Sequence, residues 1–235
     1  MSVSPFPTTR RSVVLALSSA DAAERTRAFD TLVACYWRPL YKYARVASRR
    51  TREDAEDLIQ SFFTKAFEKE SLAGYDAAKA SFRTFLRLLF DRHVANEWKA
   101  GQRLKRGGGE VHLDFESAEA EIGDERVSVT PEEYFQREWV RSVFVLAVER
   151  LRARCEMEGK HVPFAVFECY DLDDDHGVSY RDLATRFGIA ETQVTNHLSA
   201  MRRRFREIVL EALREVTATE QEFRTEARAL LGEQP

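Results

Sequence analysis

Apolar residues recur at three- and four-residue steps along most of the chain, a spacing that places them on one face of an α-helix. The first long stretch covers 21–47, where Pro39 is expected to interrupt or kink the helix. A second stretch begins at Thr51, whose following acids suit a helix start, and a third runs from Ser81 to Trp98. The pattern therefore predicts a bundle of long helices in the N-terminal half.

The helical spacing fails between about 101 and 130 and resumes in the C-terminal half. Gly107-Gly108-Gly109, followed by scattered acids, Ser and Thr, predicts a flexible linker. Periodicity returns at Pro131, a residue suited to the first turn of a helix. The helices predicted from there on cover 131–157, 162–170, 179–187 and 191–213. The last twenty residues have the pattern of a polar helical tail.

The sequence thus predicts an all-α fold, with two helical domains joined by a flexible linker. The chain has 235 residues, of which 44% are hydrophobic, and this is sufficient for two cores. Ten glycines and six prolines are too few for a turn-rich all-β protein. The expected parts are a first domain at 10–103, a linker at 104–130, a second domain at 131–215 and a tail at 216–235.

Charge and cysteine usage narrow the class of protein. The formal net charge is only −3, but basic residues cluster at 99–106 and 202–206, and acids cluster at 53–57 and 171–175. The three cysteines are widely spaced, which disfavours both a zinc site and a disulfide framework. The sequence lacks an apolar run of membrane-spanning length and a signal-peptide core. We therefore expect a cytoplasmic protein with no membrane partner, no metal and no other cofactor.

A helix-turn-helix is predicted at Val178–Leu198, where Gly188 suits a left-handed turn. Its expected core consists of Leu183, Ala184, Phe187, Ile189, Val194 and Leu198. The second helix presents short polar side chains that can reach base edges in a major groove. These are Glu191, Thr192, Thr195, Asn196 and Ser199. Arg202 and Arg203 follow and suit phosphates, whereas Ala190 is a weak helix cap. A helical hairpin with a solvated basic face is the alternative.

Four segments resemble, in this order, conserved regions of bacterial RNA polymerase sigma factors. Tyr36–Ala44 resembles region 2.1, Asp54–Phe67 resembles region 2.2, and Phe82–Trp98 resembles regions 2.3 and 2.4. The helix-turn-helix resembles region 4.2. The order, the spacing and the absence of a middle domain are similar to the extracytoplasmic-function group of the sigma-70 family. The resemblance covers about 10–103 and 131–213.

The resemblance implies a promoter-reading subunit of RNA polymerase and not an enzyme. In this family, region 2.2 docks on the basic clamp helices of the polymerase β′ subunit, which suits an acidic helix face. The residues at or beside the matching positions are Asp54, Glu56, Asp57, Gln60, Ser61 and Phe63. For the acids taken alone, a solvated helix face is the alternative.

The resemblance also implies two contacts with promoter DNA. Regions 2.3 and 2.4 melt the −10 element and hold its non-template single strand, which requires aromatic platforms and cations. The matching residues are Arg83, Arg87, Arg92, Asn96, Trp98, Lys99 and Arg103. The base-reading loop corresponds to 71–81, and the neighbouring apolar residues Phe82, Phe85, Leu86 and Leu89 are expected in the core. Region 4 reads the duplex −35 element and rests on the polymerase β flap.

The chain departs from the family pattern in the docking helix. Many relatives carry Glu where this chain has Ser61, so an expected negative group is missing from the polymerase interface. Phosphorylation of Ser61, or of Thr64 one helical turn on, would add a charge of about −1.5 to −2. Control by a Ser/Thr kinase is therefore one hypothesis, and a neutral variant of a tolerant contact is the other. An anti-sigma factor is a further candidate regulator.

The chain also departs from the family pattern in the region that contacts the −10 element. Phe90-Asp91-Arg92 replaces the Ala-Arg-Asn of many relatives, so the −10 sequence that this chain prefers is expected to differ.

An acidic loop at 171–176 precedes the helix-turn-helix. Its aspartates alternate as in a calcium loop, but His176 stands where that loop needs Gly, and Asp182 stands where it needs Glu. We therefore expect a solvated acidic extension.

Two other functional classes remain as alternatives. A DNA-binding regulator that uses only the helix-turn-helix would leave the helices at 54–67 and 82–103 unexplained. A helical enzyme is disfavoured because the sequence has no Gly-rich phosphate loop, no HExxH motif and no GxSxG motif.

Overall fold

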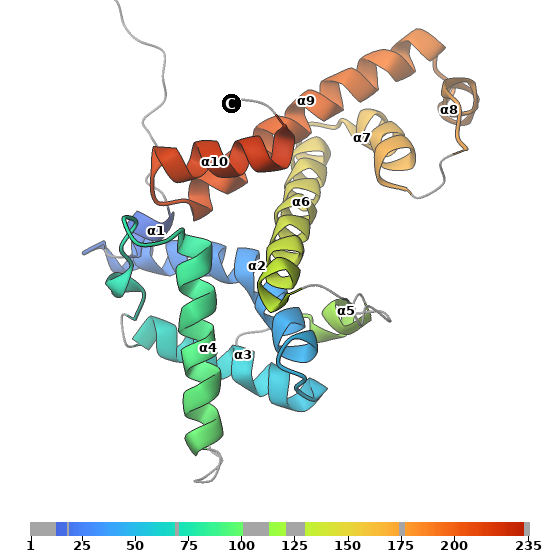
Figure 1. Cartoon of the computed structure of the whole chain (residues 1–235). Coiled ribbons are helices and arrows are strands. Elements are labelled where there is room, and N and C mark those ends of the chain that lie inside the picture. Colours follow the sequence, from blue (N-terminus) through green and yellow to red (C-terminus); the bar gives the residue numbers. More distant parts are fainter. Residues whose placement is uncertain are drawn as a thin grey trace, which may run out of the picture. The chain divides into compact units, whose positions relative to one another are not determined.

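The computed structural model describes residues 13–17, 19–68, 71–100, 113–120, 130–173 and 177–232, and these residues form helices and connections without a β-strand (Figure 1). The expected all-α class is therefore confirmed. The elements are α1 (Val13–Ala16), α2 (Ala22–Val46), α3 (Arg52–Glu68), η1 (Ser71–Gly74), α4 (Phe82–Ala100), α5 (Phe115–Ala120), α6 (Pro131–Met157), α7 (His161–Phe167), η2 (Glu168–Leu172), α8 (Tyr180–Phe187), α9 (Glu191–Val216) and α10 (Glu220–Leu231). No helix in the described part of the chain is long and apolar enough to cross a membrane.

The chain forms two compact units whose limits differ from the expected domain limits. The first unit contains the described residues up to Ser142 and those from Leu213 onward, and the second contains Val143–Ala212. The beginning of α6 and the whole of α10 therefore belong with the N-terminal helices. The linker composition before Pro131 had suggested that the whole of 131–215 forms one domain, followed by a separate tail at 216–235.

The core of the first unit is aromatic and is built from α2, α3 and α4. The Asp21 side chain caps α2 by accepting from the backbone N–H of Ala23, and the helix then continues through Pro39 without an interruption. On α3, Phe62 packs edge-to-face against Phe90 of α4, with their ring centroids 5.2 Å apart. Such edge-to-face contacts add specific geometry to the burial of apolar area, so they fix how the three helices pack.

The first half of α6 completes this core. Trp139 is 1% exposed and lies beside Tyr36, and the Phe135 ring centroid lies 5.8 Å from that of Tyr43. Between these aromatic contacts, Lys42 Nζ lies 2.7 Å from Glu138 Oε2, and both side chains are almost completely buried. The apolar and ionic contacts together explain why α6 starts in the first unit.

The short helix α5 lies within the segment expected to be a linker. Phe115 packs against Trp37 and Tyr41, with ring centroids 5.5 Å and 5.1 Å away. Glu119 accepts hydrogen bonds from the Tyr41 hydroxyl and the Arg45 guanidinium. Part of the expected linker is thus helical and anchored on α2 by one aromatic ring and one carboxylate.

The second unit contains the helix-turn-helix and the helices that support it. Phe205 of α9 packs against Phe144 and Phe167, and Cys155 of α6 contacts Met201. The helix α7 passes directly into the π-helical turn η2, so helical backbone extends to Leu172 instead of ending near 170. These contacts pack α9 against the second half of α6 and against α7.

Candidate functional site

The proposed polymerase-docking helix α3 has one buried face and one acidic face. It starts at Thr51, whose hydroxyl accepts from the backbone N–H of Asp54 at 3.1 Å. Asp54 and Asp57 are exposed, whereas Glu56 is half-buried and accepts from Arg52 Nε at 2.8 Å. Two of the predicted docking carboxylates are therefore open to a partner, and the third is partly neutralised.

The other predicted docking residues lie nearer the core. Gln60 and Ser61 are half-buried. Phe63 is 0% exposed and packs edge-to-face against Phe29. The prediction of Phe63 as a contact residue is wrong for this conformation, because its ring supports α3 from beneath and does not reach the surface.

Ser61 has a partner on α4 that the sequence did not indicate. Its Oγ lies 2.8 Å from His93 Nε2 and also donates to the Leu58 carbonyl at 3.2 Å. A histidine tautomer with its hydrogen on Nε2 satisfies both contacts, since the hydroxyl has only one hydrogen to donate. The second predicted phosphosite, Thr64, donates to the Gln60 carbonyl at 2.9 Å. Phosphorylation of Ser61 would remove the hydrogen that the hydroxyl donates to the Leu58 carbonyl and would place a charged phosphate beside His93, so its effect would extend to α4.

Two of the arginines predicted to face DNA are engaged within the protein. Arg83 lies 2.8 Å from Glu226 of α10, and its side chain is only 16% exposed. Arg87, at 13% exposed, pairs with Asp91 at 3.0 Å and with Glu132 of α6 at 3.2 Å. The prediction of an open basic face at these two positions is wrong for this conformation, because acids that lie far away in the sequence cover them.

The exposed part of the predicted −10 surface lies farther along α4. Arg92 and Asn96 are exposed. Arg103 and the side chains of Trp98 and Lys99 lie outside the described residues. Among the apolar residues expected in the core, Phe82 and Leu86 are fully buried, whereas Phe85 and Leu89 are half-buried.

The loop before α4 is anchored by an aromatic residue, Tyr75, that the apolar pattern of the sequence does not mark. The Tyr75 ring centroid lies 5.1 Å from that of Phe82 and 5.3 Å from that of Phe85. Burial and the Glu222 carboxylate raise the pKa of the Tyr75 hydroxyl to about 12. The one sequence signal for Tyr75 is that a large aromatic residue stands between Gly74 and Asp76, in a loop of otherwise small and polar residues.

The helix-turn-helix has the backbone features expected for this motif. Ser179 and Asp182 form a reciprocal capping box at the start of α8, and Gly188 ends that helix in the left-handed conformation with φ of 63°. Leu183, Val194 and Leu198 are buried, but Ala184, Phe187 and Ile189 are only half-buried. The expected small core is therefore confirmed for three of its six members.

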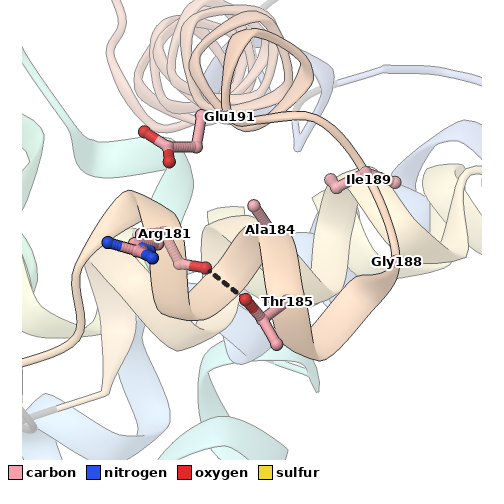
Figure 2. Close-up of a pocket in the computed structure, with 6 residues that line it drawn as sticks. All are labelled: Arg181, Ala184, Thr185, Gly188, Ile189 and Glu191. Carbon is pink, nitrogen blue, oxygen red and sulfur yellow. Dashed lines mark hydrogen bonds between the residues drawn. The ribbon is translucent and has the colours of Figure 1, made fainter.

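Two of the half-buried residues, Ala184 and Ile189, line an open hollow at the turn. It has a volume of about 410 Å³ and is bounded by Arg181, Ala184, Thr185, Gly188, Ile189 and Glu191 (Figure 2). The Thr185 hydroxyl donates to the Arg181 carbonyl at its edge. The hollow is a feature of the motif surface and contains no cluster of catalytic groups.

The first turns of α9 present the predicted base-reading residues to solvent. All five of these residues are exposed: Glu191, Thr192, Thr195, Asn196 and Ser199. The Gln193 side chain accepts from the Ala190 N–H at 2.9 Å and so supplies half of the cap that Ala190 cannot provide itself. Arg203 is exposed, while Arg202 forms a bidentate pair with Asp171 at 2.9 Å and 2.8 Å.

One acid of the segment before α8 makes an internal contact, because Asp171 pairs with Arg202, whereas Asp173 is exposed. Asp182, which stands at the last position of the calcium-loop pattern in the sequence, lies in the first turn of α8 and accepts from Ser179 in the capping box. Within the described residues, no group of His, Cys, Asp and Glu side chains is arranged to hold a metal ion. Positions 174–176 of the loop lie outside the described residues.

Comparison of the chain with protein-family models, with curated proteins and with solved structures finds no match in any of the three. The functional assignment therefore depends on the residues themselves.

Proposed function

We propose that this chain is a sigma factor of the extracytoplasmic-function type, a cytoplasmic subunit that binds core RNA polymerase and directs initiation at specific promoters. One observation carries the proposal. The same chain has an acidic docking helix, with Asp54 and Asp57 exposed on α3, and a helix-turn-helix whose polar face is exposed on α9. A regulator that only binds duplex DNA needs the second feature and not the first.

The mechanism divides between the two compact units. In the first unit, α3 would dock its carboxylates on the basic clamp helices of the β′ subunit, and α4 with the loop 71–81 would hold the melted −10 strand. In the second unit, α9 would insert its first turns into the major groove of the −35 element. The exposed Arg203 would contact a phosphate and fix the register of that helix.

Control by phosphorylation is a second part of the proposal. Ser61 is half-buried against His93, so a phosphate there would add charge to the docking helix and change its contact with His93 of α4. Binding to core polymerase is compared for Ser61→Ala and Ser61→Glu, with and without kinase treatment of the unmodified chain. Tighter binding by Ser61→Glu supports control at this site. Equal binding by both variants, together with no effect of the kinase, contradicts it.

The docking contact is tested by charge reversal. Asp57→Lys is expected to weaken binding to core polymerase by about tenfold or more, because an exposed carboxylate is replaced by a charge that the basic clamp helices repel. Glu149→Lys, at an exposed position on α6, is the matched control and should bind as the unmodified chain does. Equal loss in both variants would contradict a specific role for α3. A chain that binds duplex DNA but never core polymerase would be a regulator instead.

A further inference from the structure

The C-terminal helix α10 directs charged residues inward at its contact with the first unit. It is capped by the Thr219 side chain, ends at Gly232 and buries Phe223, Glu226 and Ala227. Glu226 is only 6% exposed, whereas glutamates are rarely buried unless they are paired. A buried carboxylate needs a specific cationic partner, so the contact of α10 is selective and not merely apolar.

The partner of Glu226 is Arg83, near the start of α4. Arg83 Nη1 lies 2.8 Å from Glu226 Oε1, and the exposed fractions of the two side chains are 16% for Arg83 and 8% for Glu226. The Arg83 guanidinium also lies 4.4 Å from the centroid of the Trp139 ring, which shields its opposite side from water. In this conformation Glu226 and Trp139 cover most of Arg83.

A second carboxylate of α10 occupies the start of the same helix. Glu222 Oε1 accepts from the backbone N–H of Phe82, the first residue of α4, at 2.7 Å. Its other oxygen accepts from the Ala218 N–H at 2.9 Å and lies 3.5 Å from the Tyr75 hydroxyl. The helix N-terminus, Arg83 and Tyr75 are three groups that would also suit a phosphate of a nucleic-acid strand.

We propose that α10 is an autoinhibitory helix, whose Glu222 and Glu226 carboxylates take the places that phosphates of the melted −10 strand occupy when the chain acts at a promoter. The proposal rests on the proposed function, which assigns the loop 71–81 and the start of α4 to that strand. Binding of the strand then requires α10 to leave.

The construction of α10 suits reversible release. A helix of 12 residues is marginal by itself in water, so α10 depends on the docked contacts for its structure. The residues from Thr217 to Thr219 connect it directly to α9. A released α10 therefore stays at a high effective concentration and returns when the DNA leaves.

Isosteric charge removal tests the proposal without polymerase. The probe is a fluorescent pool of single-stranded 20-nucleotide DNA of random sequence. Glu222→Gln/Glu226→Gln and a chain ending at Ala218 should each bind it about tenfold more tightly than the full chain. Glu220→Gln, on the exposed side of the same helix, is the matched control and should not change the affinity. If neither α10 variant binds more tightly than the unmodified chain, the proposal is overturned.

Hydrogen exchange of the unmodified chain provides a test that does not depend on whether the variants fold. Amides of 220–231 should lose protection when the same DNA saturates the chain, and the amides of α9 before residue 212 should not. Unchanged protection of 220–231 under saturation overturns the proposal. Failure to bind core polymerase would instead overturn the proposed function, because neither measurement here contains polymerase.

Discussion

Lys42 and Glu138 form the most deeply buried ion pair described in the first unit, at 2% and 5% side-chain exposure. Removing water from both charges costs several kcal/mol each, and their attraction recovers this only while both partners remain. The pair thus adds little net stability compared with an apolar pair, but it makes any other placement of α6 on α2 unfavourable.

A double-mutant cycle measures this behaviour. Lys42→Met alone should lower the free energy of unfolding by about 3 kcal/mol, because Glu138 is left buried with only the half-exposed Arg141, 2.9 Å away, as a partner. Adding Glu138→Leu should recover most of that loss. Urea denaturation of the four proteins gives the coupling, and additive losses in the double variant would contradict the account.

Asn196 and Arg203 are both exposed on α9 but have different expected roles. Asn196→Ala should reduce discrimination at one base pair of the −35 element by about 1–3 kcal/mol. Arg203→Ala should weaken binding to all duplexes alike and lower the slope of log affinity against log salt by about 1. Anisotropy titrations at several salt concentrations, on matched and single-mismatch duplexes, separate the two. Identical profiles for the two variants would contradict these roles.

At the scale of the elements, the turn of the helix-turn-helix requires a left-handed backbone conformation at one residue, Gly188. Gly188 has φ of 63°, although a Cβ atom there would meet no neighbouring atom within 4 Å. Gly188→Ala should therefore cost about 1 kcal/mol of stability through backbone strain alone, without displacing α8 from α9. Thermal unfolding checks the cost. A loss of several kcal/mol would indicate a steric role that the open surroundings of Gly188 do not support.

The docking of α5 on α2 should depend on pH. Arg45 donates to the Glu119 carboxylate, and this lowers the pKa of Glu119 below its usual range despite partial burial. A carboxyl group whose pKa is lowered on folding adds stability above its unfolded-state pKa, about 4.3, and loses it as the pH falls through the folded value.

Glu119→Gln should therefore remove part of the stability that the unmodified chain has at neutral pH, and its free energy of unfolding should fall less between pH 6 and pH 3. Glu116→Gln, at an exposed position on the same helix, is the control. Urea denaturation across this range measures the slopes, and equal slopes in the unmodified chain and Glu119→Gln would contradict the assignment.

The long helices could be predicted from the sequence because their apolar spacing persists over many turns. The limits of α3, α6, α8 and the start of α9 follow from residues such as Thr51, Pro131 and Gly188, which act locally. The helix α5 could not be predicted, because a six-residue element with few apolar positions depends on Phe115 and Glu119 finding their partners on α2.

The exposure of a candidate residue could be predicted where it follows local helix geometry, as for Asp57 and Asn196. It could not be predicted at Arg83 and Arg87, where acids more than forty residues away in the sequence cover the guanidinium groups. Helical periodicity distinguishes the apolar face of a helix from its polar face. It does not indicate which distant element will pack over the polar face.

At the scale of the whole molecule, the chain combines two compact units with separate surfaces. The first contains the acidic face of α3 and the partly covered surface of α4, and the second contains the exposed face of α9. Neither surface alone distinguishes a sigma factor from other helical proteins. The proposed function requires the two surfaces to act together on polymerase and promoter.

In vitro transcription tests this claim most directly. The purified chain is added to bacterial core RNA polymerase on a library of genomic DNA fragments, and the 5′ ends of the transcripts are mapped. We expect transcripts that depend on the added chain and whose start sites share two upstream motifs, near −10 and −35. We also expect Asp57→Lys to reduce these transcripts strongly and Asn196→Ala to change the −35 motif. Transcripts that are the same with and without the chain would contradict the account.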